Sequence, residues 1–173
     1  MGFFVYATGV ILNMDFNMIS LPLWLDEIAI ISFGFIGGVY FAFSFFVMQS
    51  LKNISDSDAI RTMNAINEVI LKSPFILLFF FSSFIALILF LENLILYTLI
   101  SKEGFSSLIF LGGIFLCTAV KNVPLNNKLA EFDLNDPLSN PEIEWNYYYK
   151  NWIKWNHIRT VSCFLSMALL LIK

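Results

Sequence analysis

The stretch "SPFILLFFFSSFIALILFLENLILYTLI", residues 73–100, decides the class of protein to which this chain belongs. After Pro74, no charged residue occurs until Glu92. A helix needs about 20 apolar residues to cross the hydrocarbon core of a bilayer, and proline is favoured at the first position of a helix. We therefore expect residues 75–100 to form a membrane-spanning helix.

The composition of the whole chain is also that of a membrane protein. Of its 173 residues, 58% are hydrophobic, 17% are aromatic and only 13% are charged, whereas about 25% of the residues of a soluble domain are charged. A water-soluble globule of this size cannot bury so many apolar side chains, so lipid must cover much of the surface. The net charge of −3 and the lack of a basic patch predict no nucleic-acid partner.

Three further apolar stretches are long enough, alone or with their flanks, to cross a bilayer. They are residues 28–48, residues 105–120 and a last stretch that ends at Ile172. The chain is thus predicted to be an all-α membrane protein, a four-transmembrane-helix bundle with an amphipathic helix in its first long loop. In this prediction, residues 23–173 form the membrane domain, and residues 1–22 are an N-terminal extension or an interfacial segment.

Small residues recur at four-residue spacing in the predicted spans, as at Gly34 and Gly38 and at Gly113 and Cys117. Such pairs let the backbones of neighbouring helices approach closely. We interpret them as positions of tight packing within the bundle. Cys117 and Cys163 lie far apart inside apolar runs, and we interpret both as small buried hydrophobic residues.

The positive charges predict the orientation in the membrane. With four spans, both termini share one side, and the loops 49–73 and 122–151 share the other. The side of the two long loops holds seven of the ten Lys and Arg residues, namely Lys52, Arg61, Lys72, Lys121, Lys128, Lys150 and Lys154. The other side holds Lys102 and Lys173. The positive-inside rule therefore places both long loops in the cytoplasm.

Both long loops show internal order. The segment "SDSDAIRTMNAINEVILKSP", residues 55–74, begins with the helix-capping residue Ser55 and reads as an amphipathic helix. Its Ile60, Met63, Ile66 and Ile70 share a face, with Asn67 beside them. The segment "DLNDPLSNPEIEW", residues 133–145, predicts a turn-rich crossing. A helix is then expected from near Glu142 into the last span.

The last helix carries an arginine at a depth where charges are costly. The stretch 160–172 makes about 20 Å of helix, against a hydrocarbon core of about 30 Å. Arg159 therefore falls within or at the edge of the core. A charge there normally faces the bundle interior and marks function. The alternative interpretation is an arginine whose head group extends to the lipid phosphates.

Helical spacing favours the interior position. A single stripe is formed by Trp152, Asn156, Arg159, Cys163 and Ser166. His157 lies off this stripe, although its intrinsic pKa suits a catalytic base. The chain has no second histidine and no ExxH pair, so we expect no metal, haem or other cofactor.

Further polar residues are predicted to reach the same membrane face. Pro124 follows the third span and is expected to end or kink that helix, which would free backbone carbonyls. With Arg159, a pocket for a small, flat, oxygen-bearing molecule would be lined by Asn67, Asn122, Asn126, Trp152 and Tyr148. Each asparagine taken alone is equally explained as a cap or turn residue.

Four motifs occur in order: "FSFFVMQSL" at 43–51, "TMNAIN" at 62–67, "KNVPLNNKL" at 121–129 and "WNYYYKNWIKWNHIRT" at 145–160. From about residue 28 onward, the chain resembles the anthrone oxygenase-like integral membrane family, much of which is known only as a domain of unknown function. The resemblance implies a four-span bundle and, for some members, oxidation of anthrones to anthraquinones without a bound metal or flavin. The shared polar set that it implies is Asn67, Asn122, Asn126, Trp152, Asn156 and Arg159.

Two functions remain open at this point. The first is a cofactor-independent oxygenase acting on a lipophilic phenolic or quinone-like small molecule, with Arg159, Asn156 and His157 as catalytic candidates. The second is a membrane binding or assembly protein in which Arg159 and the asparagines form a structural polar lock. Membrane lipid is a partner in both cases, and a membrane protein partner belongs to the second. A cavity beside Arg159 favours the enzyme, and a filled interior favours the lock.

Overall fold

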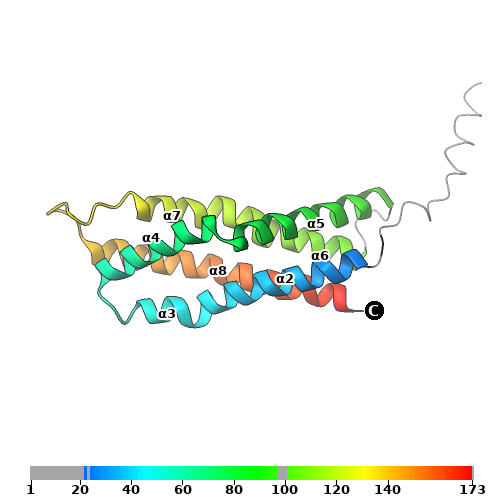
Figure 1. Cartoon of the computed structure of the whole chain (residues 1–173), viewed down its shortest axis with the longest axis horizontal. Coiled ribbons are helices and arrows are strands. Elements are labelled where there is room, and N and C mark those ends of the chain that lie inside the picture. The colour runs from blue at the N-terminus through cyan, green and yellow to red at the C-terminus, as the bar shows by residue number, and fades with distance from the viewer. Residues whose placement is uncertain (1–21, 23, 97–100, 173) are drawn as a thin grey trace, which may run out of the picture.

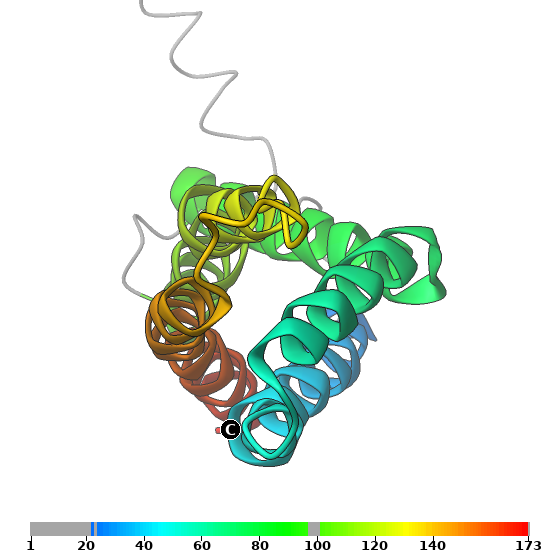
Figure 2. The ribbon, with the colours of Figure 1, turned by 90° about the vertical axis from the view of Figure 1, so that its left-hand side faces the viewer.

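The computed structural model describes residues 22, 24–96 and 101–172 of the chain. Within this part, four helical rods run along the long axis of the molecule and surround a common interior (Figures 1 and 2). The expectation for residues 1–22 falls almost wholly outside the described residues and stays a prediction. The same holds for the predicted end of the second span at residues 97–100.

The rods are built from consecutive elements. The first comprises α2 (Trp24–Ala42), the π-helical segment η2 (Phe43–Val47) and α3 (Met48–Leu51). The second comprises α4 (Asp56–Lys72) and α5 (Pro74–Leu96). The third comprises α6 (Lys102–Phe110), the π-helical segments η3 (Leu111–Leu116) and η4 (Thr118–Asn122), and α7 (Val123–Ala130). The fourth is α8 (Pro141–Leu171) alone.

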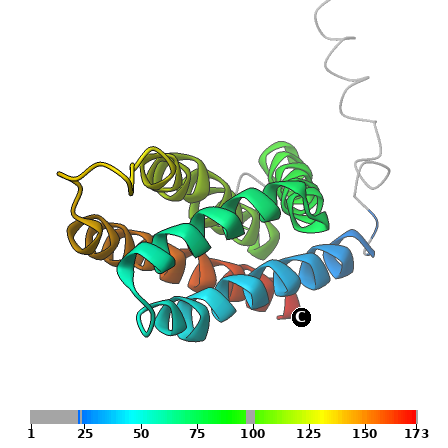
Figure 3. The same ribbon diagram turned by 60° about the vertical axis from the view of Figure 1, so that its left-hand side comes forward.

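The second rod is interrupted at Ser73. Its backbone is extended there, with φ −92° and ψ 163°, because a residue before proline is excluded from the helical region. Figure 3 shows α4 running from the end of α3 towards the start of α5. The sequence placed this helix in a loop, whereas the structure packs it into the bundle, where it contacts α5, α7 and α8.

The helix ends follow the expected capping chemistry. Ser55 caps α4 by accepting a hydrogen bond from the Asp58 amide at 3.2 Å. Asn140 caps α8 by accepting from the Ile143 amide at 3.2 Å, with Pro141 in the first turn. The turn at 52–55 and the loop 131–140 lie at one end of the bundle, and α8 ends at the other (Figure 1).

Three helices in the described part of the chain are long and apolar enough to cross a membrane: Trp24–Leu51, Pro74–Leu96 and Lys102–Ala130. The chain is therefore a multi-pass membrane protein. α8 is not among the three, although its 31 residues give it about 46 Å of length. Its polar side chains between Lys154 and Arg159 offset the apolar residues that follow them.

The third rod is longer than the span that the sequence predicts. The predicted span stopped at residue 120, and Pro124 was expected to end or kink the helix. The rod instead continues to Ala130. Pro124 lies in the first turn of α7, where the missing N–H and the fixed φ of proline are tolerated.

Two apolar clusters fill the interior at different levels. One joins α2, α5, α6 and the C-terminal half of α8 around Phe33 and Phe110, whose rings stack with centroids 3.8 Å apart. The other joins α3, α4, α7 and the N-terminal half of α8 around Met63, Leu129 and Tyr148. Cys163 belongs to the first cluster and Trp152 to the second. The stretch of α8 between these two residues carries the buried polar groups.

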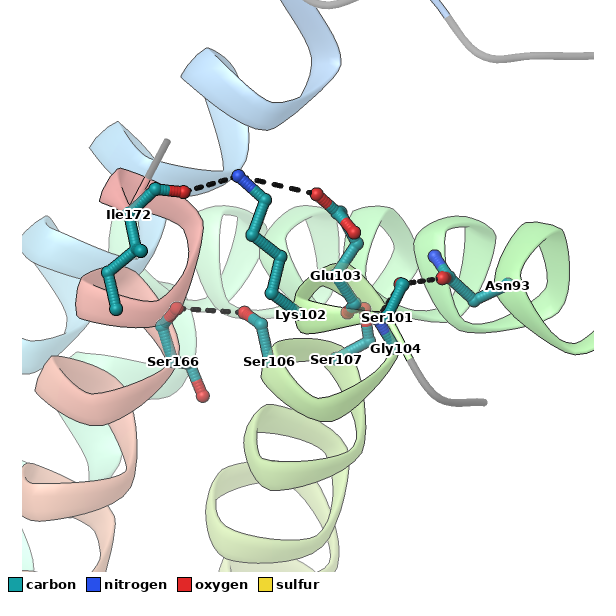
Figure 4. A network of polar contacts seen from close by, with 9 residues as sticks. All are labelled: Asn93, Ser101, Lys102, Glu103, Gly104, Ser106, Ser107, Ser166 and Ile172. Carbon is teal, nitrogen blue, oxygen red and sulfur yellow. Dashed lines mark hydrogen bonds and ion pairs between the residues drawn. The ribbon is translucent and has the colours of Figure 1, made fainter. Parts of the chain in front are cut away.

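Polar contacts join α6 to α8 at the end of the bundle where α8 terminates (Figure 4). Ser106 of α6 donates from its hydroxyl to the Ser166 carbonyl of α8 at 2.8 Å. The Lys102 ammonium donates to the Ile172 carbonyl and lies 3.6 Å from the Glu103 carboxylate. These contacts hold the end of α8 against α6 and so fix the helix that carries the site.

Candidate functional site

The buried face of α8 is the stripe that spacing predicts. All five residues of the stripe are at most 4% exposed: Trp152, Asn156, Arg159, Cys163 and Ser166. The arginine head group therefore lies inside the bundle. It does not extend to the membrane surface, as the alternative interpretation would require.

Arg159 is held by neutral side chains. Its Nη2 donates to the Asn156 Oδ1 at 2.7 Å, and its Nη1 donates to the Thr118 hydroxyl at 3.3 Å. The guanidinium carbon lies 4.2 Å from the centre of the Tyr40 ring and 5.2 Å from that of Trp152. Aromatic faces attract a cation. None of the salt bridges among the described residues involves Arg159.

Asn156 links α8 to the first rod and orients the arginine. Its amide nitrogen donates to the Tyr40 carbonyl and to the Ser44 hydroxyl, both at 2.8 Å. Ser44 also shares a hydrogen bond of 3.0 Å with the Thr160 hydroxyl. With its amide nitrogen engaged in this way, Asn156 presents its oxygen to Arg159 in a fixed orientation.

π-Helical segments, or the turn next to one, supply the partners of Arg159 and Asn156. Ser44 lies in η2, and Thr118 begins η4. Tyr40 lies one turn before η2. π-Helical turns are rare, and they occur frequently at functional sites because they redirect side chains within a helix. Here they lie at the same level on two rods.

A cavity of about 360 Å³ opens beside the arginine. It lies within the size range of small-molecule sites. Its walls are mainly apolar and include the rings of Phe43, Phe75, Phe79, Phe80 and Phe115. Its polar lining consists of Tyr40, Asn67, Thr118, Asn126, Trp152 and Arg159. Leu71 and Phe80 line it and are also 65% and 55% exposed, so the cavity reaches the lipid-facing surface.

The amides after the third span reach the last helix, as the sequence predicts. Asn122 donates from Nδ2 to the Trp152 carbonyl at 3.3 Å. Asn126 accepts from the Tyr148 hydroxyl at 2.9 Å. Asn126 lines the cavity, whereas Asn122 and Tyr148 are buried behind its wall. The prediction that at least one of the two amides contacts this helix is thus confirmed.

His157 lies away from these groups. Its side chain is exposed, and its ring centre lies 5.7 Å from that of Phe45 on the outside of the bundle. It does not line the cavity. Arg159 does not bond backbone carbonyls near Pro124 either, because the rod stays helical there and the guanidinium instead contacts Thr118 and Asn156.

Sequence reasoning did not single out Tyr40, Ser44 and Thr118. A usable signal was present. Tyr40 and Ser44 are four residues apart in a span that is otherwise almost wholly apolar. Polar groups at such positions face the protein interior because lipid cannot satisfy them.

The fold and the site define an integral membrane protein in which a buried, permanent positive charge meets a lipophilic cavity. The chain belongs to the anthrone oxygenase family, whose family model matches residues 74–169. The matched region includes Thr118, Asn126, Trp152, Asn156 and Arg159. The searches of curated proteins and of solved structures found no significant match.

Proposed function

We propose that this protein is a cofactor-independent oxygenase whose substrate is an anthrone or a related lipophilic phenol that enters the cavity from the membrane. The observation that carries this proposal is Arg159, which is 4% exposed, has only neutral protein partners and lines an apolar cavity that reaches the lipid-facing surface. The name of the family supports the choice of substrate class.

The reaction balances without a redox cofactor. An anthrone loses a proton from its methylene carbon, and the electron pair delocalises onto the carbonyl oxygen. The resulting enolate gives one electron to O2, and the two radicals combine to form a carbon–oxygen bond. The peroxide anion then takes up a proton and becomes a hydroperoxide. The hydroperoxide then loses water and leaves a second carbonyl. Anthrone and O2 thus give anthraquinone and one water.

In this proposal, Arg159 stabilises the negative charge on the enolate oxygen. Its charge is permanent at all physiological pH values, and the low dielectric of the cavity strengthens the interaction. Asn156 acts as a positioning residue because it fixes the orientation of the guanidinium. The cavity lining contains no carboxylate or imidazole, so Arg159 favours loss of the proton by stabilising the enolate, and a water molecule accepts the proton.

The test is oxygen consumption and quinone absorbance with anthrone and the purified protein in detergent. Arg159→Gln is expected to lower kcat/KM by about 100-fold, the usual effect of removing one oxyanion donor. The control is Val161→Ala, a substitution on the 64% exposed outer face of the same helix. Equal activity of the Arg159→Gln variant, in a sample with an unchanged melting temperature, would refute the proposal.

The structural lock is the second candidate. The bonds of Asn156 to Tyr40 and Ser44 and of Arg159 to Thr118 join three rods, which favours a role in assembly or in binding a membrane protein partner. In that case, Arg159 variants lose stability, and the protein shows no oxygen consumption with any anthrone.

We further propose that α8 is the fourth transmembrane helix and that the segments 52–55 and 131–140 face the cytoplasm. Asn156, Arg159 and Ser166 of α8 face the bundle interior, so they do not oppose insertion of its outer face. The exposed Lys154 and His157 lie on the N-terminal side of its apolar segment. The excess of Lys and Arg near these two segments supports the orientation.

A further inference from the structure

We propose that the cavity takes its ligand as an oxyanion and therefore selects flat aromatic molecules with an ionised oxygen over their neutral forms. This inference rests on the proposed function insofar as both concern the same cavity. It adds the ionisation state of the ligand and names Trp152 and Asn67 as specificity-determining residues beside Arg159.

The first line of evidence is the set of donors without partners. Three buried N–H groups of lining residues have no acceptor in hydrogen-bond geometry among the described residues: Arg159 Nε, Trp152 Nε1 and, apart from a looser approach to the Tyr148 hydroxyl, Asn67 Nδ2. A buried donor without a partner is costly, and native proteins seldom contain one. Three on the wall of one cavity indicate that a ligand supplies the acceptors.

Two side-chain acceptors of the same wall are already in use. The Asn126 carbonyl oxygen accepts from Tyr148, and the Thr118 hydroxyl oxygen accepts from Arg159. The buried side-chain oxygens that lack a partner, such as Asn122 Oδ1, belong to residues that do not line the cavity. A neutral phenol would bring an O–H donor to a wall that offers mainly donors, whereas a phenolate or enolate brings only acceptors.

The second line of evidence is charge. Arg159 is the only charged residue of the lining, and no carboxylate among the described residues forms a salt bridge with it. A buried charge without a counter-charge is unfavourable. An anionic oxygen in the cavity supplies that counter-charge and accepts hydrogen bonds from the free donors at the same time.

The side chains of the cavity wall indicate the chemistry of the remaining, uncharged part of the ligand. Five phenylalanine rings and the Trp152 indole surround the space. Aromatic side chains pack favourably against aromatic rings in offset or edge-to-face arrangements. The site therefore fits a fused aromatic ring better than an alkyl chain. A fatty acid carries the same anionic chemistry, so the experiment includes it as a separate arm.

The probe is 2-hydroxyanthraquinone, which is already fully oxidised and changes colour when its hydroxyl ionises. It is titrated with pH in detergent, without oxygen, with and without saturating protein. The protein is expected to lower the apparent pKa of the bound probe by at least one unit, because a tenfold preference for the anion corresponds to one unit. The methyl ether of the probe, which cannot ionise, is expected to bind at least tenfold more weakly at neutral pH.

Single substitutions measure how much each donor contributes to the shift in the apparent pKa of the probe. Arg159→Gln is expected to abolish the shift. Trp152→Phe keeps the ring but removes the N–H, and Asn67→Leu removes the amide, so each is expected to reduce the shift in part. Lys121→Gln is the matched control, because Lys121 is an exposed cation outside the lining and its removal should leave the shift unchanged. The melting temperature of every variant is measured, and only folded variants are compared.

Three outcomes would overturn the inference: equal binding of the probe and its methyl ether, a shift that persists in folded Arg159→Gln protein, and dodecanoate that displaces the probe with a lower Kd than that of the probe itself. The assay needs no turnover. A protein that shifts the probe but consumes no oxygen with anthrone retains the inference and refutes the proposed oxygenase, and the reverse result does the opposite.

Discussion

Arg159 is a cation inside the bundle that is fixed by two neutral acceptors and two aromatic faces. The planar guanidinium contacts Thr118 with one terminal nitrogen and Asn156 with the other. A lysine ammonium is a single point and cannot reproduce this fork. The geometry therefore makes a strong distinction between arginine and lysine, although both carry the same charge.

Arg159→Lys is expected to destabilise the protein by about 1–3 kcal/mol, the cost of a buried polar group that loses its partner. The measurement is thermal unfolding in detergent, with Val161→Ala as the control on the same helix. If the lysine variant unfolds at the same temperature as the unaltered protein, Arg159 is an interfacial anchor and the assignment of the site is wrong.

Asn156→Leu is expected to cost a similar amount, about 1–3 kcal/mol. Leucine has nearly the same size, but it leaves the Arg159 Nη2 without its Asn156 acceptor and removes the hydrogen bonds to the Tyr40 carbonyl and the Ser44 hydroxyl. The matched control is Asn151→Leu, because the one hydrogen bond of the Asn151 side chain within the described part of the chain goes to a carbonyl of its own helix, that of Tyr147 at 2.8 Å. Equal melting temperatures of the two leucine variants would show that the bonds of Asn156 to the first rod are unimportant.

At the scale of the elements, close helix packing depends on particular glycines. A Cβ added at Gly37 would lie 2.9 Å from the Cys163 Cβ, and one at Gly113 would lie 2.1 Å from the Ser162 Oγ and 2.5 Å from its Cβ. Gly38 and Gly112 have no such neighbour within 4 Å. The first rod thus approaches α8 closely at Gly37, and the third rod does so at Gly113. The adjacent Gly38 and Gly112 are not points of close approach.

Gly113→Ala is expected to destabilise the protein by about 1–3 kcal/mol, because η3 and α8 must separate to admit the new methyl group. Gly112→Ala is the control from the adjacent position, and it should leave stability unchanged or raise it, since alanine favours a helix over glycine by about 1 kcal/mol. Both are compared by thermal unfolding in detergent. A Gly113→Ala variant as stable as Gly112→Ala would mean that the two helices are not held in this contact.

At the scale of the whole molecule, the two connecting segments lie at one end of the bundle. Seven of the ten Lys and Arg residues occur between residues 52 and 72 or between residues 121 and 154. Leu138 is 92% exposed in one of these segments, and Ile172 is 60% exposed at the other end. The two cysteines of the chain are both buried, so an introduced cysteine can be labelled selectively.

Leu138→Cys is expected to react with an impermeant maleimide only in inside-out vesicles, and Ile172→Cys only in right-side-out vesicles. The physical reason is the retention of Lys and Arg on the cytoplasmic side. Labelling is read by gel mobility, and detergent-opened vesicles provide the control for full access. Labelling of Leu138→Cys from the outside would invert the proposed orientation, and labelling of both variants from one side would exclude α8 as a span.

The sequence by itself determined the class of the molecule and one face of its site. The apolar stretch 73–100 requires lipid, and the spacing from Trp152 to Ser166 defines the buried face of α8 without any knowledge of its neighbours. Both are local properties, because hydropathy and helical periodicity are set by consecutive residues. The capping of α4 and α8 was predictable for the same reason.

Only the tertiary structure decided which residues contact the buried face of α8. The partners Tyr40, Ser44 and Thr118 come from rods far away in the sequence, and η2 and η4 set their direction through a register that apolar periodicity does not reveal. The tertiary structure likewise decided that α4 packs within the bundle, that the third rod continues through Pro124 and that His157 faces outward. These features depend on which helices pack together and at what rotation, and in a chain that is apolar on nearly every face, no local pattern fixes that choice.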